Sequence, residues 1–444
     1  MNILLKKYNV AAPRYTSYPT VPHWESDKFT TEKWLMALQK TYNDHKEEGI
    51  SLYIHLPFCE NLCTYCGCNT RITKNHNVEL PYLKAVLKEW EMYTSALGEK
   101  PKIKEIHLGG GTPTFFSPAN LETLILGIVG QSVGDMDCSF EGHPDNTTID
   151  HLQTLHHLGF KRLSLGIQDF DPKVQLMINR YQTPGQVLAI TSQARAIGYE
   201  SINFDLIYGL PFQTLAGLSE TLTEVIAMKP ERIAFYSYAH VPWMKPGQRH
   251  YHEKDIPQGD EKFALYQMGR ERLIEAGYQE IGMDHFALKK DKLFKASQHA
   301  QLHRNFMGYT DRYTKILIGL GVSSISDCHT AFVQNNKTVE GYLKDIENGS
   351  IAIEKGHLAT PEDLLIKAHI LNLMCKGLTC FENQIPIPTQ QRLSELQADH
   401  LIEMDGKQIC VTSVGRSFLR NICMALDERL WKFKSETSLF SKAV

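Results

Sequence analysis

The sequence predicts an α/β protein whose centre is a partial, TIM-like barrel of six βα units, with an N-terminal arm and a mainly helical C-terminal domain. From residue 50 onward, short apolar runs alternate with longer amphipathic ones, as expected for a parallel sheet covered by helices. Several amphipathic runs end at a glycine, which is a common helix stop signal. Distinctive polar motifs follow the apolar runs, where α/β barrels place their active sites.

Six apolar runs are the expected strands, and they lie at residues 51–56, 104–108, 138–142, 162–167, 201–206 and 232–238. The expected helices between them cover residues 81–97, 121–129, 149–158, 186–197 and 215–228. The first helix begins with Pro81, which suits a first helical turn, and it spaces Leu83 and Leu87 at a helical interval. Gly159 and Gly198 mark the ends of the third and fourth helices.

The chain divides into three expected parts. Residues 1–49 form an arm for substrate binding or packing, residues 50–355 form the barrel and its extension, and residues 356–444 form the C-terminal helical domain. The length of 444 residues agrees with more than one domain.

Composition narrows the class of protein. With 42% hydrophobic and 22% charged residues, the chain is not disordered, collagenous or a disulfide scaffold. Its formal net charge of −3 gives no electrostatic reason to expect nucleic-acid binding. The N-terminus has no apolar run suited to a signal peptide, and no later run approaches the length of a membrane span. We therefore expect a cytoplasmic protein without a membrane span or a nucleic-acid partner, and we expect a monomer.

Three cysteines follow the first strand at C-x3-C-x2-C spacing, namely Cys59, Cys63 and Cys66. Thiolates at this spacing can hold three irons of a [4Fe–4S] cluster and leave the fourth iron open for a cofactor. Cys68 lies close by, so a four-cysteine zinc site is the alternative, although such sites usually draw ligands from two separated pairs. The remaining cysteines are scattered, and we expect them to be buried structural thiols: Cys138, Cys328, Cys375, Cys380, Cys410 and Cys423.

A second group of candidate residues follows the other strands. Gly109, Gly110 and Gly111 come after the second strand, and residues without side chains let backbone groups approach a ligand closely. Later strands end in polar residues or short motifs: Glu141, Gln168–Asp169, Asp205 and Ala239–His240. Taken singly, these residues have ordinary explanations, such as a turn, a core position or a helix N-cap. Their shared place at strand ends favours a binding site.

The segment from Tyr53 to Cys66 resembles the radical S-adenosylmethionine (SAM) superfamily, in which the methionine end of SAM chelates the open iron. Ordered blocks along nearly the whole chain further resemble one family of that superfamily, the oxygen-independent coproporphyrinogen III oxidases of haem biosynthesis. These blocks lie at residues 8–20, 66–69, 166–170, 179–180, 205–211, 283–286, 303–306, 321–326 and 420–424.

The resemblance implies a reaction and its cofactors. The reaction is the oxidative decarboxylation of the propionates on rings A and B of coproporphyrinogen III to vinyl groups, giving protoporphyrinogen IX through a 5′-deoxyadenosyl radical from SAM. The implied cofactors are a [4Fe–4S] cluster, one catalytic SAM and a second SAM. The implied partners are the substrate and a reductase or flavodoxin-type electron donor.

The resemblance also assigns roles residue by residue. The cluster ligands would be Cys59, Cys63 and Cys66, which with Tyr53 and Glu141 form the expected catalytic set. The contacts to the catalytic SAM would be Tyr53, Gly110, Glu141 and Ile325. The positions that match the second SAM site are Gly111, Thr112, Gln168, Arg180, Asp205 and Ala239.

The arm is the expected substrate feature, since Arg14, Tyr15 and Tyr18 combine cationic and aromatic groups suited to a tetracarboxylate macrocycle. A segment that only wraps the domain is the alternative. Because the chain departs from the family pattern near Glu141 and in later blocks, a haem-binding, chaperone-like paralogue is the competing function, although such relatives lack the arm block and Cys68. The departures are His143, Met307 and Lys315.

Overall fold

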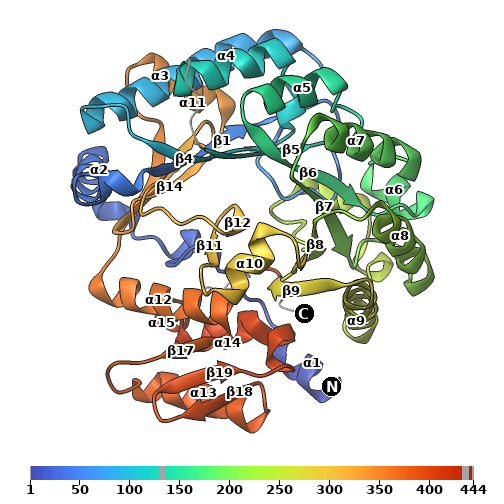
Figure 1. Ribbon diagram of the computed structural model, residues 1–444. Coiled ribbons are helices and arrows are strands. Elements are labelled where there is room, and N and C mark those ends of the chain that lie inside the picture. Colours follow the sequence, from blue (N-terminus) through green and yellow to red (C-terminus); the bar gives the residue numbers. More distant parts are fainter. Residues whose placement is uncertain (1, 131–135, 433–439, 443–444) are drawn as a thin grey trace.

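The computed structural model describes residues 2–130, 136–432 and 440–442. Its centre is a curved sheet of twelve strands with helices along its outer side (Figure 1). Six strands match the predicted ones: β1 (Ile50–Leu56), β4 (Ile103–Gly110), β5 (Asp137–Gly142), β6 (Phe160–Gln168), β7 (Ser201–Tyr208) and β8 (Arg232–Ser237). They are neighbours in this order, and each adjacent pair is parallel. The predicted partial (βα)6 barrel is confirmed.

The helices between these strands are α3 (Glu79–Leu97), α4 (Pro118–Val129), α5 (Ile149–His157), α6 (Pro172–Ile178), α7 (Pro184–Ile197) and α8 (Leu215–Met228). Helix α8 has the predicted bounds, whereas α3 begins two residues before Pro81. Helix α7 begins at Pro184 because Thr183 caps it and forms a capping box with Gln186. Helix α6 was not predicted, and its seven residues are too few for a clear periodic signal.

The sheet continues beyond the six parallel strands on both sides. Next to β1 lie β13 (Leu317–Leu320), which is parallel to it, and then the antiparallel strands β14 (Ile325–Asp327), β15 (Ala331–Asn335) and β16 (Ile353–Leu358). Beyond β8 lie β10 (His285–Leu288) and β9 (Tyr278–Gly282). Strand β16 crosses residue 355, so the sheet runs past the proposed boundary, and the domain division itself stays a prediction.

Other elements cover the edges and the concave side of the curved sheet. The covering helices are α2 (Thr31–His45), α9 (Asp260–Glu275), α10 (Lys292–Gln298) and α11 (Val339–Glu347). A separate hairpin of β11 (His303–Asn305) and β12 (Gly308–Thr310) lies on the concave side of the sheet (Figure 1). In the part of the chain that the structure describes, no helix is long and apolar enough to cross a membrane.

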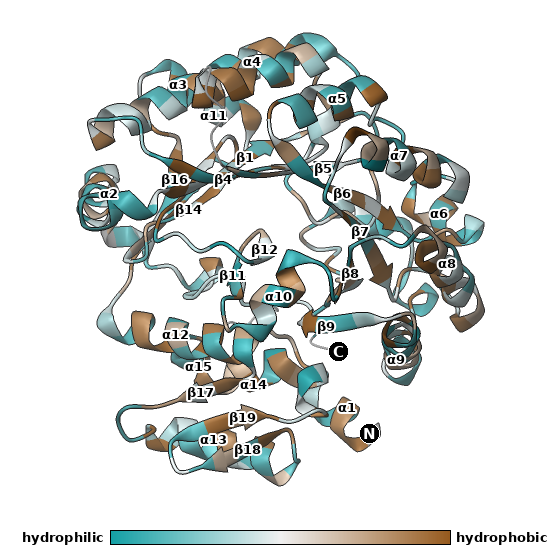
Figure 2. Cartoon of the chain, in the orientation of Figure 1, coloured by the Kyte–Doolittle hydropathy of each residue, from teal (hydrophilic) through white to brown (hydrophobic). Residues whose placement is uncertain are grey.

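Alternating side chains divide the sheet into a dry outer side and a polar inner side. Leu52, Ile54 and Leu56 of β1 are fully buried in the core beneath the helices, and the strands of the sheet carry both hydrophobic and hydrophilic residues (Figure 2). The other alternation of the parallel strands lines the interior with polar groups: Glu105, His107, Ser139, Glu141, Arg162, Ser164, Asn203 and Asp205. The barrel interior is therefore a polar chamber, suited to a charged ligand.

The C-terminal domain is helical, as predicted, and also contains a small sheet. Its helices are α12 (Pro361–Lys376), α13 (Ile387–Ala398), α14 (Leu419–Leu426) and α15 (Glu428–Lys432). Its antiparallel strands, which were not predicted, are β17 (Leu378–Cys380), β18 (Ile402–Asp405) and β19 (Gln408–Val411). These elements enclose a second apolar core, separate from that of the barrel.

The N-terminal arm closes this second core. Helix α1 (Asn2–Tyr8) and the following segment bury Tyr8, Tyr15 and Tyr18 there, and the Tyr15 hydroxyl donates to Asp427. The Arg420 guanidinium donates to backbone carbonyls on both sides, those of residues 12–13 and 441–442. Tyr15 and Tyr18 thus serve packing, whereas Arg14 reaches the barrel by donating to the Ser237 carbonyl over 2.6 Å.

A buried carboxylate fixes the loop between β13 and β14. Glu89 of α3 accepts hydrogen bonds from the Gly321 amide, the Asn335 amide and the Tyr342 hydroxyl at 2.6 to 2.8 Å. Burial raises the pKa of Glu89 to about 7 despite these donors. The loop leads into Ile325, so Glu89 determines where this candidate residue lies.

Stability is expected to fall between pH 5 and pH 8 because of Glu89. The folded state, with its raised pKa, keeps a proton that the unfolded state releases near pH 4.5, so stability is lost as the pH rises toward 7. Each unit of pKa difference corresponds to about 1.4 kcal/mol. In Glu89→Gln the amide cannot ionise, and melting temperatures measured at both pH values should differ less than in the parent. An equal difference in both proteins would contradict this account.

Candidate active site

The cysteine loop leaves the C-terminal end of β1 and folds back on itself through the short strands β2 (Phe58–Cys59) and β3 (Arg71–Ile72). Its middle is held by the end of α6. The Thr64 amide donates to the Ile178 carbonyl over 3.0 Å, and its hydroxyl donates to the Met177 carbonyl over 2.8 Å. The Asn179 amide donates to the Leu62 carbonyl. The unpredicted helix α6 thus supports the predicted cluster loop.

The cysteine loop and the strand ends enclose a cavity of about 310 Å³. Cys59, Cys63 and Cys66 line it together with Cys68. Seven of the ten predicted cofactor contacts also line it: Gly110, Gly111, Thr112, Glu141, Gln168, Arg180 and Asp205. Residues from five different strands therefore converge on one site, as their strand-end positions suggest.

Glycines 109–111 bring the end of β4 against both β1 and the cysteine loop. A Cβ on Gly109 would lie 2.9 Å from the Tyr53 ring and 3.1 Å from Glu141 Oε1, and one on Gly111 would lie 2.5 Å from the Pro57 carbonyl oxygen. Glu141 Oε2 accepts from the Gly110 amide over 3.2 Å, and Oε1 lies 3.3 Å from His107 Nε2. Because Glu141 remains half-exposed in the cavity, its carboxylate can accept further donors such as an ammonium group.

Arg180 places a cation beside the cysteines. Its Nη1 donates to Cys63 Sγ over 3.7 Å, and its Nη2 donates to the Gly166 carbonyl. The side chain is buried, and the charge of the cysteines and the phenol of Tyr65 help to raise its pKa against the effect of burial. A guanidinium in this position can bind a carboxylate in a bidentate fork. Gln168, with a φ of 67°, lies on the same wall at a bulge in β6.

Asp205 supplies a second carboxylate to the cavity. Its Oδ2 accepts from the Ser164 hydroxyl over 3.0 Å, and its Oδ1 accepts from Asn203 over 2.8 Å. Burial, and then the nearby charge of Glu141, raise its pKa to about 6. An arriving cationic or hydroxyl-bearing ligand would therefore meet a carboxylate whose charge is not compensated by a salt bridge.

Three predicted cofactor contacts do not line the cavity. The Tyr53 ring stacks on His107, with ring centroids 5.9 Å apart, and meets Phe306 edge-on. Ala239 lies past the end of β8, where its carbonyl accepts from Gln248 over 3.1 Å. Ile325 lines a separate small pocket between the arm and the β11–β12 hairpin. Their assigned contacts remain predictions.

The donor set fits a [4Fe–4S] cluster with three protein ligands. Cys59 Sγ lies 3.3 Å from the Thr112 hydroxyl, and burial raises the pKa values of the Cys59 and Cys63 thiols. Thiolates therefore form together with metal binding, as is usual for metal ligands. Within the described residues no three His, Cys, Asp or Glu side chains converge on a single ion. Ligands of a cubane bind separate irons and need no such convergence.

The remaining cysteines are all free thiols. Cys138, Cys328 and Cys423 are buried, as predicted, and Cys375 and Cys410 are half-buried. Cys380 is exposed at the end of a short strand of the unpredicted small sheet, so its predicted burial is wrong. Cys68 lines the cavity next to Cys66, and the two thiols share a hydrogen bond that lowers the pKa of Cys66.

One cavity-lining residue, Tyr236, carried no clear signal in the sequence. Tyr236 lines both the cofactor cavity and the chamber beneath it. Its position in an apolar strand predicts a core residue instead. The Arg14 guanidinium lies 6.0 Å from the centre of the Tyr236 ring, so the arm reaches this residue. His143 also faces the cavity, where its Nδ1 accepts from the Asp145 amide, and burial lowers its pKa to about 3. His143 is therefore a neutral donor beside Arg180.

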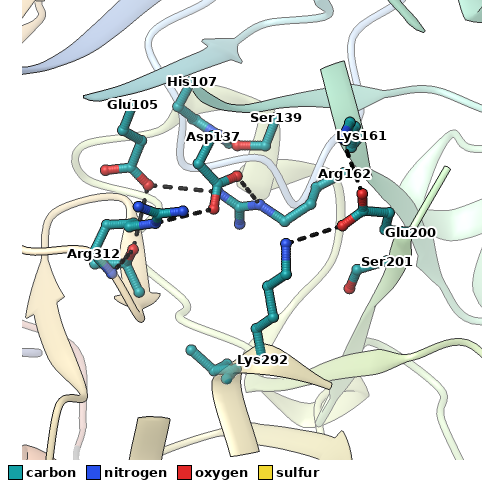
Figure 3. A network of polar contacts seen from close by, with 12 residues as sticks. Glu105, His107, Asp137, Ser139, Lys161, Arg162, Glu200, Ser201, Lys292 and Arg312 are labelled. Carbon is teal, nitrogen blue, oxygen red and sulfur yellow. Dashed lines mark hydrogen bonds and ion pairs between the residues drawn. The ribbon is translucent and has the colours of Figure 1, made fainter. Parts of the chain in front are cut away.

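A buried ionic layer closes the opposite end of the barrel. Arg162 Nε donates to Asp137 over 2.7 Å, and its Nη2 approaches Glu105 at 3.5 Å. Figure 3 shows Arg162 between these two carboxylates, with Arg312 approaching Asp137 from the other side at 3.9 Å. The layer lies near the N-terminal ends of β4, β5 and β6. In α/β barrels this end serves stability rather than catalysis.

The variant Arg162→Met is expected to lose about 3 kcal/mol of unfolding free energy, because two buried carboxylates lose their main cation. Urea denaturation measures this change. The matched control is Lys161→Met, since the neighbouring Lys161 makes only an exposed ion pair with Glu200, worth less than about 1 kcal/mol (Figure 3). Equal losses in both variants would contradict the structural role of the buried layer.

Comparison with known proteins agrees with this geometry. A model of the radical SAM superfamily matches residues 53–225. The chain is 38% identical to the oxygen-independent coproporphyrinogen III oxidase of Pseudomonas aeruginosa, over 96% of this chain and 95% of the relative. It is 36% identical to the enzyme of the same name from Escherichia coli, over 99% and 98% of the two chains.

A solved structure supports the same assignment. The coproporphyrinogen III oxidase from Escherichia coli, described as a radical SAM enzyme, superposes with a TM-score of 0.88 at 34% sequence identity, over 96% of this chain and 98% of that one. The similarity therefore includes the arm, the barrel and the C-terminal domain rather than the barrel alone. On this evidence the chain belongs to the oxygen-independent coproporphyrinogen III oxidase family, within the radical SAM superfamily.

Proposed function

We propose that this protein converts coproporphyrinogen III to protoporphyrinogen IX by oxygen-independent oxidative decarboxylation of the ring A and ring B propionates. The observation that carries the proposal is the convergence of three cysteines with seven predicted cofactor contacts on one cavity. The relatives that match nearly the full length of the chain bear the name of this activity. The ten free thiols support a reducing compartment, and we place the enzyme in the cytoplasm.

Cys59, Cys63 and Cys66 would hold the cluster, and Arg180 would offset part of the negative charge of the thiolates. When bound, the reduced [4Fe–4S] cluster and SAM supply one-electron cleavage of SAM and a radical able to remove hydrogen from the substrate. Glu141 would accept from the ammonium group of SAM, since one of its oxygens already accepts from the Gly110 amide and the carboxylate faces the cavity. Asp205 would accept from the hydroxyl or ammonium groups of a second SAM.

The site also has to exclude water from reactive species. The β11–β12 hairpin and Tyr236 wall the chamber beneath the cofactor cavity, and Arg14 lies over the Tyr236 ring. Arg14 would pair with a substrate carboxylate beside Tyr236, since Arg14 points to the barrel whereas the two tyrosines of the arm's Arg-Tyr-x-x-Tyr motif point into the second core.

The decisive experiment is anaerobic. The cluster is reconstituted, dithionite, SAM and coproporphyrinogen III are added, and protoporphyrin, 5′-deoxyadenosine and methionine are measured. Formation of protoporphyrin together with SAM cleavage is the expected result. Tight haem binding without a vinyl product would instead favour the haem-binding paralogue and overturn the proposal. The physiological reductant is proposed to be a one-electron carrier protein of the flavodoxin type.

A further inference from the structure

Large apolar side chains are exposed around the cluster loop. We define the cluster rim as three segments: residues 59–74, residues 171–183 and residues 239–250. Each segment carries two large apolar side chains with at least 39% exposure, and these are Leu62, Ile72, Leu176, Tyr181, Trp243 and Met244. Isolated exposed apolar residues are ordinary, whereas a group of them on one surface usually marks an interaction site.

The three segments form one surface because the second and third are bonded to the cluster loop itself. Residues 177–180 bond to Leu62, Cys63 and Thr64, as described above. In the third segment, Lys245 Nζ donates to the Cys68 carbonyl over 2.9 Å, and Gln248 donates to the Tyr65 carbonyl over 3.0 Å. Trp243 and Met244 precede these anchors directly. The exposed side chains therefore surround the position of the cluster.

The charge of the rim is opposite to that of the whole chain. The three segments contain six lysines and arginines but only two acidic residues, Glu60 and Asp171. Arg180 is buried in the cavity, and Arg71 pairs with Glu340 over 2.6 Å, so the excess of positive charge on the rim comes from Lys74, Lys173, Lys245 and Arg249. The protein as a whole has a formal net charge of −3. Asp171 is moreover used to cap α6, where it accepts from the Lys173 and Val174 amides. A positive surface that also carries exposed apolar side chains is complementary to an acidic protein partner.

We propose that the cluster rim is the docking surface for the electron carrier, and that this carrier is an acidic one-electron protein donor. The inference rests on the proposed function, because each cleavage of SAM there consumes one electron. In each docking event the carrier is oxidised by one electron and the enzyme's cluster is reduced by one, with no bond formed between the proteins. Docking at the rim places the donor against the loop that bears Cys59, Cys63 and Cys66.

The test uses the reconstituted holoenzyme and reduced flavodoxin, an acidic one-electron carrier. Two rim variants are compared, the double variant Trp243→Ala/Met244→Ala and the charge reversal Lys74→Glu/Lys173→Glu. Binding of flavodoxin is measured by titration calorimetry, and cluster reduction by flavodoxin or by dithionite is followed by stopped-flow absorbance. The matched control is Met36→Ala/Ile387→Ala, which removes exposed apolar side chains from α2 and α13 instead.

The apolar variant is expected to bind flavodoxin at least about tenfold more weakly, as for loss of an aromatic hot spot. The charge reversal should slow reduction by flavodoxin at low salt and remove its salt dependence. Reduction and SAM cleavage with dithionite should be unchanged in both, and the control should match the parent. Unchanged flavodoxin binding, equal losses with both reductants, or a raised KM for coproporphyrinogen III with dithionite would overturn the proposal. Failure of vinyl formation with dithionite in the parent would instead refute the proposed function.

Discussion

Replacing Cys59 with alanine is expected to abolish SAM cleavage and porphyrin formation. Cys59 lies in β2, where its position is fixed by pairing with Ile72 and by the Thr112 hydroxyl, so no neighbouring thiol can take its place without rebuilding the strand. Because only Cys63 and Cys66 would remain as protein ligands, the cluster should not be retained. Iron and sulfide content, together with 5′-deoxyadenosine released under dithionite, measure the effect.

The control for this experiment is another cysteine of the same chain. Cys380 is exposed in the small C-terminal sheet, and Cys380→Ala should retain the parent's iron content and its rate of SAM cleavage. Retention of a full cluster by Cys59→Ala would show that Cys68, which lies in the same cavity, can act as the third ligand. In that case the assignment of Cys59, Cys63 and Cys66 as the ligands would be wrong.

The second large effect is expected from Gly111→Ala. An added Cβ would lie 2.5 Å from the Pro57 carbonyl oxygen and 2.9 Å from that of Phe58, and both are backbone atoms that cannot rotate away. The end of β4 would have to separate from the cluster loop, and this would disturb Thr112, which contacts Cys59. We expect loss of most of the cluster and of SAM cleavage, with thermal unfolding only moderately lowered.

Gly67→Ala is the matched control for this substitution. Gly67 also lines the cavity within the cluster loop, but no atom lies within 4 Å of its added Cβ. This variant should assemble the cluster and cleave SAM at close to the parent's rate. Comparable losses in both variants would mean that the loop tolerates no side chain, and the argument from the contact between β4 and the cluster loop would fail.

Much of the fold could be predicted because each parallel strand carries apolar residues at alternating positions, and glycines such as Gly198 mark helix ends. Short elements could not. The seven residues of α6 and the three- and four-residue strands β17 to β19 are too brief for a periodic pattern. Their conformation depends on contacts with distant parts of the chain, such as the bond from Thr64 to the end of α6.

The candidate site was predicted where a motif and a strand end coincide, as at Gly110 and Glu141, which now lie in one cavity. Side-chain direction was the part that sequence could not supply. Tyr15 and Tyr18 are suited in composition to a macrocycle, yet they point into the second core. Tyr236 has the sequence signature of a packed strand residue and nevertheless lines the cavity, because the inner face of this barrel is polar.

The bonds that Arg420 makes to both ends of the chain have a consequence for synthesis on the ribosome. The arm cannot take its final place until its partners have been translated, and Tyr15 and Asp427 are 412 residues apart. At 5 to 20 residues per second, this interval is roughly 20 to 80 s. The six parallel strands, which end at Ser237, are translated in about the first half of that period. Iron and sulfide can therefore reach the three cysteines of the nascent barrel before the arm is fixed between the C-terminal domain and the end of β8.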